Sequence, residues 1–467
     1  MEDKFYDQCG VFGIYSNEID VAQATFLGLY ALQHRGQESA GISTVDQDGL
    51  HSHKGMGLVQ QVFNENNLKS LKGNLAIGHV RYSTTGESRI ENAQPVVVQY
   101  KKGKIAVAHN GNLVNALKLK AELEENGSIF QSTVDSEVII HLIARSKKPT
   151  IREALIESLK RIEGAYSLVL LTENEVIAVR DPSAFRPLCI GTIGNSYCVA
   201  SESCALEQIG AQYIRPVEPN EMVVIDKDGL SSYSMEQEKK RSMCIFELIY
   251  LARPDSLVFE KSVYLTRKEF GKVLAREHHV EADLVIAVPD SGIPSALGYS
   301  EESGIPYDMG LLRNHYVGRT FIQPDQFFRS SKVRIKLSPV SEMIKGKRII
   351  IVDDSIVRGT TSREIVRMLR NAGAKEIHLM VSSPPINYPC FYGIDTPTRE
   401  ELLAPKYKNQ VDEIKKYLDA DSVYYLSMEG LLNVMKNDCD DYCLACFDGN
   451  YPVLPVDYQE TSTIKKC

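Results

Sequence analysis

Short apolar runs of strand length dominate the first half of the chain. Six of them are rich in β-branched residues and cover 11–15, 75–80, 105–109, 167–171, 176–179 and 222–225. Apolar residues recur at helical spacing in 21–33 and 136–145, which predicts two helices. Runs of strands set apart by helices are typical of packed sheets covered by helices. The pattern therefore predicts an α+β N-terminal part.

The second half of the chain alternates between the two patterns. Helix-like segments at 268–277, 293–299 and 363–371 are interleaved with apolar strands at 284–288, 348–352 and 377–381. This alternation predicts an α/β domain with a doubly wound parallel sheet. A polar and charged stretch at 226–242 separates the two halves, and we place a domain boundary there.

The composition fits two globular domains. The chain has 467 residues, 43% of them hydrophobic and 24% charged, and this length can bury a core in each of two domains. The net charge of −8 gives no reason to expect broad attraction to nucleic acids or membranes. No apolar run has the length of a membrane span, and residues 1–8 lack the features of a signal peptide. We therefore expect a cytoplasmic protein.

The segment 348–369, RIIIVDDSIVRGTTSREIVRML, has the chemistry of a phosphate site. An apolar strand precedes two carboxylates, a glycine and several hydroxyls, and we expect a helix to begin near Ser362. Free N–H groups at a helix N-terminus bind anions, and a glycine lets the backbone approach them closely. Asp353 and Asp354 suit vicinal ribose hydroxyls, directly or through Mg²⁺. The alternative is an ordinary capped helix with solvated aspartates.

This segment resembles the 5-phosphoribosyl-1-pyrophosphate (PRPP) motif of type I phosphoribosyltransferases. The resemblance implies that Asp353 and Asp354 lie at the ribose hydroxyls and hold Mg²⁺, one ion per subunit. It also implies that the following loop binds the 5′-phosphate. The loop residues are Ser355, Val357, Arg358, Gly359, Thr360 and Thr361. The segment 288–291, VPDS, implies Ser291 as another Mg²⁺ or pyrophosphate contact.

Cys9 opens a strand-like segment, CGVFG, and is a candidate nucleophile. A histidine commonly activates such a cysteine, and His79 or His109 could serve. Alternatively, removal of residues 1–8 would give Cys9 a free α-amine, whose pKa of about 7.7–8.0 suits a general base near neutral pH. The structural alternative is a buried core cysteine.

Several polar side chains near the predicted strands describe a site for a free α-amino acid. Arg81 can bind a carboxylate bidentately, and Asp135 can bind an ammonium group. The side chain of Asn110 and the backbone of Gly111 offer two N–H donors for an oxyanion. These residues lie in HVRYS, VDSE and HNGNL, and a fourth polar segment, QHRGQES, covers 33–39.

These segments resemble the class II glutamine amidotransferases, which are N-terminal-nucleophile hydrolases with an αββα sandwich. With the PRPP motif downstream, the chain resembles the glutamine PRPP amidotransferase (amidophosphoribosyltransferase) family over nearly its whole length. The resemblance implies Cys9 as nucleophile, Arg81 and Asp135 as glutamine anchors, and Asn110 and Gly111 as oxyanion hole.

The activity implied by the family joins the two sites. Glutamine hydrolysis releases ammonia, which attacks C1 of PRPP to give 5-phosphoribosylamine, pyrophosphate and glutamate. This is the first committed step of purine biosynthesis, and the family implies feedback inhibition by purine nucleotides and a homotetramer. The implied division is a propeptide at 1–8, an amidotransferase domain at 9–235, a phosphoribosyltransferase domain at 243–446 and a tail at 447–467.

Four cysteines form a candidate metal site. Cys443 and Cys446 make a C-x-x-C pair, and Cys244 and Cys390 lie far upstream. Such residues hold zinc, an iron–sulfur cluster or a redox disulfide, or remain unligated thiols. The resemblance is to the subgroup with a cleaved propeptide and one [4Fe–4S] cluster per subunit, which implies these four cysteines as ligands. Cys439 leaves open which two C-terminal cysteines bind. We expect a structural or oxygen-sensing cluster.

Two other functions fit part of the sequence. A hexosamine-phosphate synthase would need sugar-isomerase domains, and the loop at 353–361 argues against it. A PRPP-responsive regulator that binds nucleic acid would need a basic face, which the net charge disfavours. The segment 313–336 does carry six Arg or Lys residues against one acid, and we expect it to form a lid over the pyrophosphate.

Overall fold

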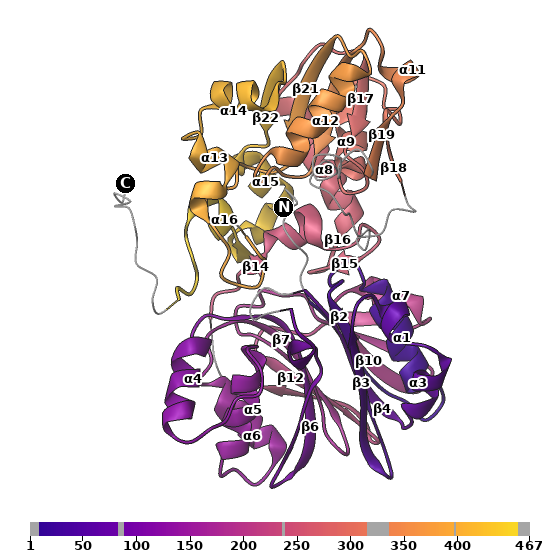
Figure 1. The fold of residues 1–467 in the computed structure, drawn as a ribbon, viewed down its shortest axis with the longest axis vertical. Coiled ribbons are helices and arrows are strands. Elements are labelled where there is room, and N and C mark those ends of the chain that lie inside the picture. Colours follow the sequence, from indigo (N-terminus) through magenta and orange to yellow (C-terminus); the bar gives the residue numbers. More distant parts are fainter. Residues whose placement is uncertain (1–8, 83–87, 236–238, 315–335, 397, 456–467) are drawn as a thin grey trace.

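Two stacked domains make up the computed structural model (Figure 1), which describes residues 9–82, 88–235, 239–314, 336–396 and 398–455. The side chains of 437–439 lie outside this description. The N-terminal domain, indigo to magenta, holds two antiparallel sheets. The C-terminal domain, rose through orange to yellow, is built on a parallel sheet. The predicted lid at 313–336 falls mostly outside the described residues.

The first sheet of the N-terminal domain has seven strands in the order β11-β9-β10-β1-β4-β2-β3. β1 is central because it pairs with β10 on one side and β4 on the other, so the residue that precedes it starts deep in the molecule. The strands are β1 (Gly10–Tyr15), β2 (Ser39–Asp46), β3 (Gly49–Met56), β4 (Leu75–Arg81), β9 (Cys189–Ile193), β10 (Ser196–Ala200) and β11 (Gln212–Pro216).

The second sheet has six strands in the order β13-β12-β8-β7-β6-β5. Its strands are β5 (Val96–Tyr100), β6 (Gly103–Leu113), β7 (Gly164–Leu171), β8 (Val176–Arg180), β12 (Glu221–Asp226) and β13 (Gly229–Ser234). An apolar core that includes Val11, Ile77, Ala108 and Val169 lies between the two sheets. β1 and β6, which carry candidate catalytic residues, therefore belong to facing sheets.

Helices cover the outer face of each sheet. The first sheet packs against α1 (Val21–Ala31), α2 (Val59–Val62), α3 (Glu65–Ser70) and α7 (Ser203–Gln208). The second packs against α4 (Ala116–Glu125), α5 (Ser136–Arg145) and α6 (Ile151–Leu159). The layers are helix, sheet, sheet and helix, which confirms the predicted αββα sandwich.

The C-terminal domain has a four-stranded parallel sheet in the order β17-β20-β21-β22. Its strands are β17 (Leu284–Ala287), β20 (Arg348–Asp353), β21 (Glu376–Val381) and β22 (Ser422–Tyr425). One face packs against α8 (Val263–Glu277), α9 (Ile293–Ser303) and α15 (Met428–Met435), and the other against α12 (Thr360–Asn371) and α14 (Val411–Leu418). Helices on both faces confirm the predicted doubly wound sheet.

Short elements complete the C-terminal domain. They are β14 (Met243–Cys244), the π-helix η2 (Glu247–Leu251), β15 (Leu257–Val258), β16 (Lys261–Ser262), β18 (Leu311–Arg313), β19 (Leu337–Pro339), α11 (Ser341–Ile344), α13 (Leu403–Lys406), β23 (Tyr442–Cys443) and α16 (Ala445–Asp448), with 3₁₀ turns at Arg399–Glu401 and Lys436–Asp441. A further 3₁₀ turn, Ile90–Asn92, lies between β4 and β5 in the N-terminal domain. None of the helices in the described part of the chain is long and apolar enough to cross a membrane.

The element boundaries differ from the sequence expectations in a few places. The predicted helix at 21–33 ends at Ala31, and the helix expected near Ser362 begins two residues earlier, at Thr360. The polar stretch 226–242 is not all linker, because 229–234 form the edge strand β13. This strand exposes most of its polar side chains at the edge of the sheet, so its sequence lacks an apolar face.

Candidate active sites

Cys9 lies directly before the central strand β1 and is buried. Its Sγ lies 3.6 Å from the carbonyl oxygen of Tyr82, and its own carbonyl oxygen accepts a hydrogen bond of 3.1 Å from Arg35 Nε. Burial raises the pKa of the Cys9 thiol. Because the thiol is therefore protonated at neutral pH, attack on a substrate needs a base that removes the proton.

Neither candidate histidine is hydrogen-bonded to the Cys9 thiol in the described part of the chain. His79 Nε2 lies 3.0 Å from the carbonyl oxygen of His109, and burial lowers the pKa of His79 to about 3. His109 Nδ1 lies 3.0 Å from Ser136 Oγ and 3.4 Å from a carboxylate oxygen of Asp135. The imidazoles thus link β4 to β6 of the facing sheet and β6 to the start of α5, and the contacts favour a base other than histidine.

Asn110 and Gly111 lie on β6, in the sheet that faces β1. The Asn110 side chain is 1% exposed, and among the described residues neither its Nδ2 nor its Oδ1 has a hydrogen-bond partner. A buried amide without partners costs free energy, so this side chain is positioned to bind a ligand. Gly111 has a φ of +148°, and a Cβ there would lie 2.1 Å from the carbonyl oxygen of Ala165. Its backbone therefore requires glycine.

Three charged side chains act on the Cys9 thiol. Arg81, Asp135 and Glu38 all influence its pKa electrostatically, which places them around the same site. Arg81 is buried at the end of β4 and forms an ion pair with Glu38. Glu38 was not assigned a role from the sequence. The structure brings it to Arg81 because Ser39, the next residue, lies opposite Arg81 in the sheet. Alone, a glutamate in a polar segment gives no signal of this contact.

Asp135 is held as a carboxylate before α5. Burial by itself would raise its pKa, but the charge and hydrogen bond of His109 and backbone N–H groups keep the pKa below its ordinary value. Its Oδ2 accepts a hydrogen bond of 2.9 Å from the backbone N–H of Leu113. The carboxylate is thus fixed and charged close to the thiol, as binding of a substrate ammonium group requires.

The second candidate site lies at the point of the parallel sheet where successive strands are added on opposite sides. From β17 the chain passes through α9 to Tyr307, which bridges the outer side of β17, whereas β20 leads on to β21 and β22 on the opposite side. Open α/β sheets bind ligands at the carboxyl ends of the strands at such a switch point. The segments that follow β17 and β20 are the predicted VPDS and DDS segments, and they meet there.

The side chains at this edge form a compact group. Asp353 and Asp354 are both 1% exposed, and Ser291 Oγ donates a hydrogen bond to Asp354 Oδ2 across the switch point. Ser355 Oγ donates to Asp354 Oδ1 at 2.6 Å, and the Asp354 N–H donates to Asp353 Oδ1 at 2.9 Å. Two carboxylates and a hydroxyl fit Mg²⁺, which is bound by few protein ligands together with substrate oxygens.

The loop after the carboxylates leads into the N-terminus of α12. Gly359 is its N-cap, with a φ of +78°, and a Cβ there would lie 2.9 Å from Leu403 Cδ2. Thr360 and Thr361 are the first helical residues, so free N–H groups and hydroxyls meet at this end. Val357 is fixed by a 2.8 Å hydrogen bond from Leu403 N–H to its carbonyl oxygen, and Arg358 lies 3.6 Å from Glu401.

Arg267 on α8 is a functional candidate that sequence reasoning missed. It is 1% exposed, and its guanidinium donates to the carbonyl oxygens of Leu248 at 2.9 Å and Ala252 at 2.8 Å. Burial lowers its pKa to about 10, so it stays charged at neutral pH. Among the acidic side chains, Asp354 opposes this lowering of the pKa most. Nothing in a helix sequence signals that an arginine is influenced electrostatically by Asp354, 87 positions away.

The four candidate cluster cysteines converge below the parallel sheet. Cys244 on β14 lies opposite Cys443 on β23, in a parallel pair. Burial raises the pKa of Cys446 well above its ordinary value, and Cys443, Cys244 and Cys390 raise it further, so the four thiols lie near one another. All four are free thiols. The side chain of Cys439 lies outside the described residues.

The four thiols are candidate ligands for a metal group. Among the described residues, no three His, Cys, Asp or Glu side chains are grouped as one metal ion requires. A [4Fe–4S] cluster binds one thiolate to each of four irons, so its ligands stand farther apart than those of zinc. The candidate ligands of such a cluster are two buried thiols, Cys244 and Cys446, and two partly buried ones, Cys390 and Cys443.

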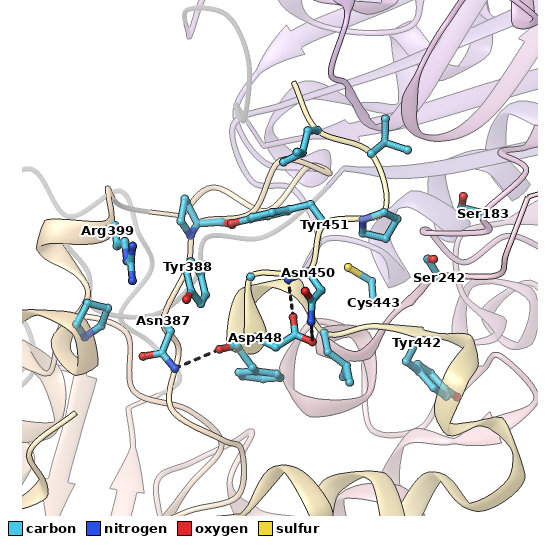
Figure 2. Close-up of a pocket in the computed structure, with 18 of the residues that line it drawn as sticks. Ser183, Ser242, Asn387, Tyr388, Arg399, Tyr442, Cys443, Asp448, Asn450 and Tyr451 are labelled. Carbon is cyan, nitrogen blue, oxygen red and sulfur yellow. Dashed lines mark hydrogen bonds between the residues drawn. The ribbon is translucent and has the colours of Figure 1, made fainter. Parts of the chain in front are cut away.

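A cavity of about 1640 Å³ lies beside this cysteine group, and Cys443 is part of its lining. Figure 2 shows the Cys443 thiol among the lining residues, with Tyr388, Asp448 and Tyr451. Neither Cys9 nor the loop after β20 lines it. The cavity gives one of the four candidate ligands access to small molecules.

The comparisons with known proteins match both domains. A glutamine amidotransferase domain model matches residues 79–208, and a phosphoribosyl transferase domain model matches residues 272–386. The amidophosphoribosyltransferase of Bacillus subtilis is 51% identical over 96% of this chain and 94% of its own length. The amidophosphoribosyltransferase of Synechocystis is 52% identical, over 97% and 92%.

This chain belongs to the amidophosphoribosyltransferase family. The family predicted from the sequence is thereby confirmed, and the match to a phosphoribosyl transferase domain removes the hexosamine-phosphate synthase alternative. Both matched segments lie inside the predicted domains at 9–235 and 243–446, whose boundaries stay predictions.

Solved structures of the family have the same fold over the whole chain. The B. subtilis glutamine PRPP amidotransferase in complex with ADP and GMP has a TM-score of 0.91 and 50% identity, covering 97% of this chain and 99% of its own. A structure described as the allosteric regulatory enzyme of purine biosynthesis has a TM-score of 0.92 and 51% identity, covering 97% and 98%.

Proposed function

We propose that this protein is a glutamine-dependent amidophosphoribosyltransferase that makes 5-phosphoribosylamine in purine biosynthesis. The observation that carries the proposal is that one chain holds both sites. One is a buried thiol before β1 with a buried, unpartnered amide on the facing sheet, and the other is a carboxylate-rich anion site at the switch point of a parallel sheet. The family membership supports the same conclusion.

The first half-reaction is glutamine hydrolysis. A general base takes the proton of the Cys9 thiol, and Sγ attacks the side-chain amide carbon of glutamine. The C–N bond then breaks, and the protonated base gives its proton to the leaving ammonia. Water then cleaves the thioester, which releases glutamate and restores the thiol. The Asn110 side chain and Gly111 N–H stabilise the oxyanion in both steps. Arg81 binds the substrate carboxylate and Asp135 its ammonium group.

The second half-reaction is phosphoribosyl transfer. Ammonia attacks C1 of PRPP, the bond from C1 to the pyrophosphate oxygen breaks, and pyrophosphate leaves. Asp353 and Asp354 hold the ribose hydroxyls, and the N-terminus of α12 with Ser355, Val357, Arg358, Gly359, Thr360 and Thr361 holds the 5′-phosphate. Mg²⁺, bound by Asp353, Asp354 and Ser291, would neutralise charge on the pyrophosphate. Because ammonia protonates in water, we expect an enclosed route between the domains.

The general base in the first half-reaction is the α-amine of Cys9, so residues 1–8 must be removed. The raised pKa of the thiol and the lack of an imidazole bonded to it in the described structure support this assignment. We expect N-terminal sequencing and intact mass of the active enzyme to show Cys9 as the first residue. Fully active enzyme that retains residues 1–8 would contradict the assignment.

Replacement of Asn110 by alanine tests the oxyanion hole. Loss of one oxyanion donor costs about 10²–10³ in kcat, so Asn110→Ala should lower glutamine hydrolysis by that factor and leave ammonia-dependent synthesis unchanged. Asn126→Ala is a matched control, because this exposed amide caps α4 through its own helix backbone. Glutaminase activity equal to that of the parent would remove Asn110 from the mechanism.

The four converging cysteines hold a [4Fe–4S] cluster, one per subunit, that ties the C-terminal segment to the domain junction. We expect about four irons per chain and a broad visible absorbance in anaerobically purified protein. Cys446→Ser should lose both, whereas Cys204→Ser, in the N-terminal core, should retain both. Stoichiometric zinc without iron would reject the cluster.

Nucleotide inhibition, oligomeric state and location complete the proposal. The structural relative that was solved with ADP and GMP supports feedback inhibition by purine nucleotides. We expect AMP-type or GMP-type nucleotides to raise the PRPP concentration needed for half-maximal rate. The homotetramer and the cytoplasmic location are carried over as predictions, to be tested by solution mass and by fractionation.

A further inference from the structure

Two arginines and two glutamates form a buried group at the junction of the domains. Arg35, Arg186, Glu202 and Glu247 are each at most 1% exposed, and we call them the junction cluster. Arg35 donates to both carboxylate oxygens of Glu247, at 2.9 and 2.8 Å, and to Glu202 at 2.6 Å. Arg186 lies 3.4 Å from Glu247. Glu247 comes from the C-terminal domain and Arg35 from the N-terminal one, so their bonds cross the junction.

One end of the junction cluster holds the nucleophile. The third nitrogen of the Arg35 guanidinium, Nε, donates a hydrogen bond of 3.1 Å to the carbonyl oxygen of Cys9. A guanidinium has a rigid planar fork, so fixing its two terminal nitrogens also fixes the direction of Nε. The position of the Cys9 backbone therefore depends on Glu247, a residue 238 positions away.

The other end of the junction cluster leads to the phosphoribosyl site. Glu247 is the first residue of the π-helix η2, and π-helical turns are often found at functional sites. The carbonyl oxygens of Leu248 and Ala252, in and just after this turn, accept the two hydrogen bonds from Arg267. Arg267 is in turn bonded to α9, the helix that follows Ser291 at the switch point, because Ser295 Oγ donates to the carbonyl oxygen of Arg267 at 3.0 Å.

Stability alone gives little reason to keep such a group. Burying an ion pair costs desolvation free energy, and well-packed apolar residues of similar volume are often equally or more stabilising. Buried ion pairs are better explained where they fix a geometry. Here the geometry runs without a gap from the Cys9 carbonyl through Arg35, Glu247 and η2 to Arg267.

We propose that Glu247 is a positioning residue for Cys9, and that the Arg35–Glu247 pair is the link through which PRPP binding raises glutamine hydrolysis. The inference rests on the proposed two-site function. Ligand binding at Asp354 and its partner Ser291 acts on the start of α9. Ser295 of α9 is bonded to Arg267, and Arg267 is bonded to η2, which carries Glu247. The pair then adjusts the Cys9 backbone without touching either substrate.

The test uses full-length holoenzyme and three rates: ammonia-dependent synthesis, glutaminase activity without PRPP, and glutaminase activity with PRPP. Glu247→Gln keeps the shape but removes the charge. We expect ammonia-dependent synthesis within about twofold of the parent, and the PRPP stimulation of glutaminase to fall by about tenfold or more, mainly in kcat rather than in the KM for glutamine.

The matched control is Arg253→Ala. Arg253 also crosses the junction, since its Nη1 donates to the carbonyl oxygen of Ala31 at 3.2 Å, but its side chain has no recorded bond to Arg35 or Glu247 within the described structure. Its PRPP stimulation should equal that of the parent. If Glu247→Gln misfolds, Glu247→Asp retains the charge and shortens the reach, and the same loss of stimulation is expected.

Three results separate failure of the link from failure of the proposed function. Equal stimulation by PRPP in the parent, Glu247→Gln and Glu247→Asp, with all rates intact, would overturn the link and leave the function standing. A parallel fall of all three rates in the folded variants would make Glu247 purely structural and would also overturn the link. A parent enzyme with no glutaminase or synthesis activity would instead overturn the proposed function.

Discussion

Cys9→Ala is expected to abolish glutamine-dependent synthesis while ammonia-dependent synthesis persists. Removal of a nucleophile from a catalytic unit lowers kcat by about 10⁴–10⁶. The phosphoribosyl site lies in the other domain, with its own sheet and its own anion loop, so added ammonia can bypass the missing step. Steady-state rates with glutamine and with ammonium salts, on the same preparation, measure both.

The control for this variant is Cys198→Ala. Cys198 is a fully buried thiol on β10, the neighbour of β1, and lies opposite Ile14 in the register. The Cys198→Ala substitution removes the same thiol group from the same sheet. A merely structural role for Cys9 therefore predicts similar losses in both variants. Loss of both activities in a folded Cys9→Ala protein would contradict the two-site mechanism.

The parts of the fold that the sequence predicts are those with local signals. β20, the two carboxylates and the start of α12 are contiguous, so the chemistry of the phosphoribosyl site is visible in some twenty residues. The strands β1, β4, β6 and β7 are apolar because both of their faces are covered, and each was predicted to within a few residues.

Two of the strands that escaped prediction are polar strands at sheet edges. β3, with the sequence GLHSHKGM, pairs only with β2 at the edge of its sheet, and β13 lies at the edge of the other. An edge strand with no fully buried side chains has no apolar alternation, so its sequence resembles a loop. Its formation depends on the hydrogen bonds of its partner strand, which the local sequence does not encode.

The charged contacts of the site escaped prediction for a different reason. Arg35 and Glu247 are 212 positions apart, and Arg81 meets Glu38 across 43 positions. Their pairing follows from the register of the first sheet and from the docking of the two domains, which form only in the folded chain. The sequence shows that these charged residues are present, but only the fold shows that their side chains come together near Cys9.

Asp354→Asn is expected to raise the PRPP concentration needed for half-maximal rate by about 10- to 150-fold, since a hydrogen bond to a charged group contributes about 1.5–3 kcal/mol. The substitution keeps the side-chain volume and an acceptor for Ser291 or Ser355, so the switch point should stay folded. It removes the charge that we propose binds the ribose and Mg²⁺. Both glutamine- and ammonia-dependent synthesis should show the same increase, because they share this site.

The matched control is Asp283→Asn, at the opposite end of the parallel sheet. Asp283 Oδ2 accepts a hydrogen bond of 2.8 Å from the backbone N–H of Arg348, the first residue of β20. It thus occupies the amino end of the strand that ends at Asp353, and its loss should leave PRPP kinetics unchanged. Unchanged PRPP kinetics in Asp354→Asn as well would remove Asp354 from the phosphoribosyl site. Because ligands bind at the carboxyl ends of parallel strands, only the variant at that end is expected to respond.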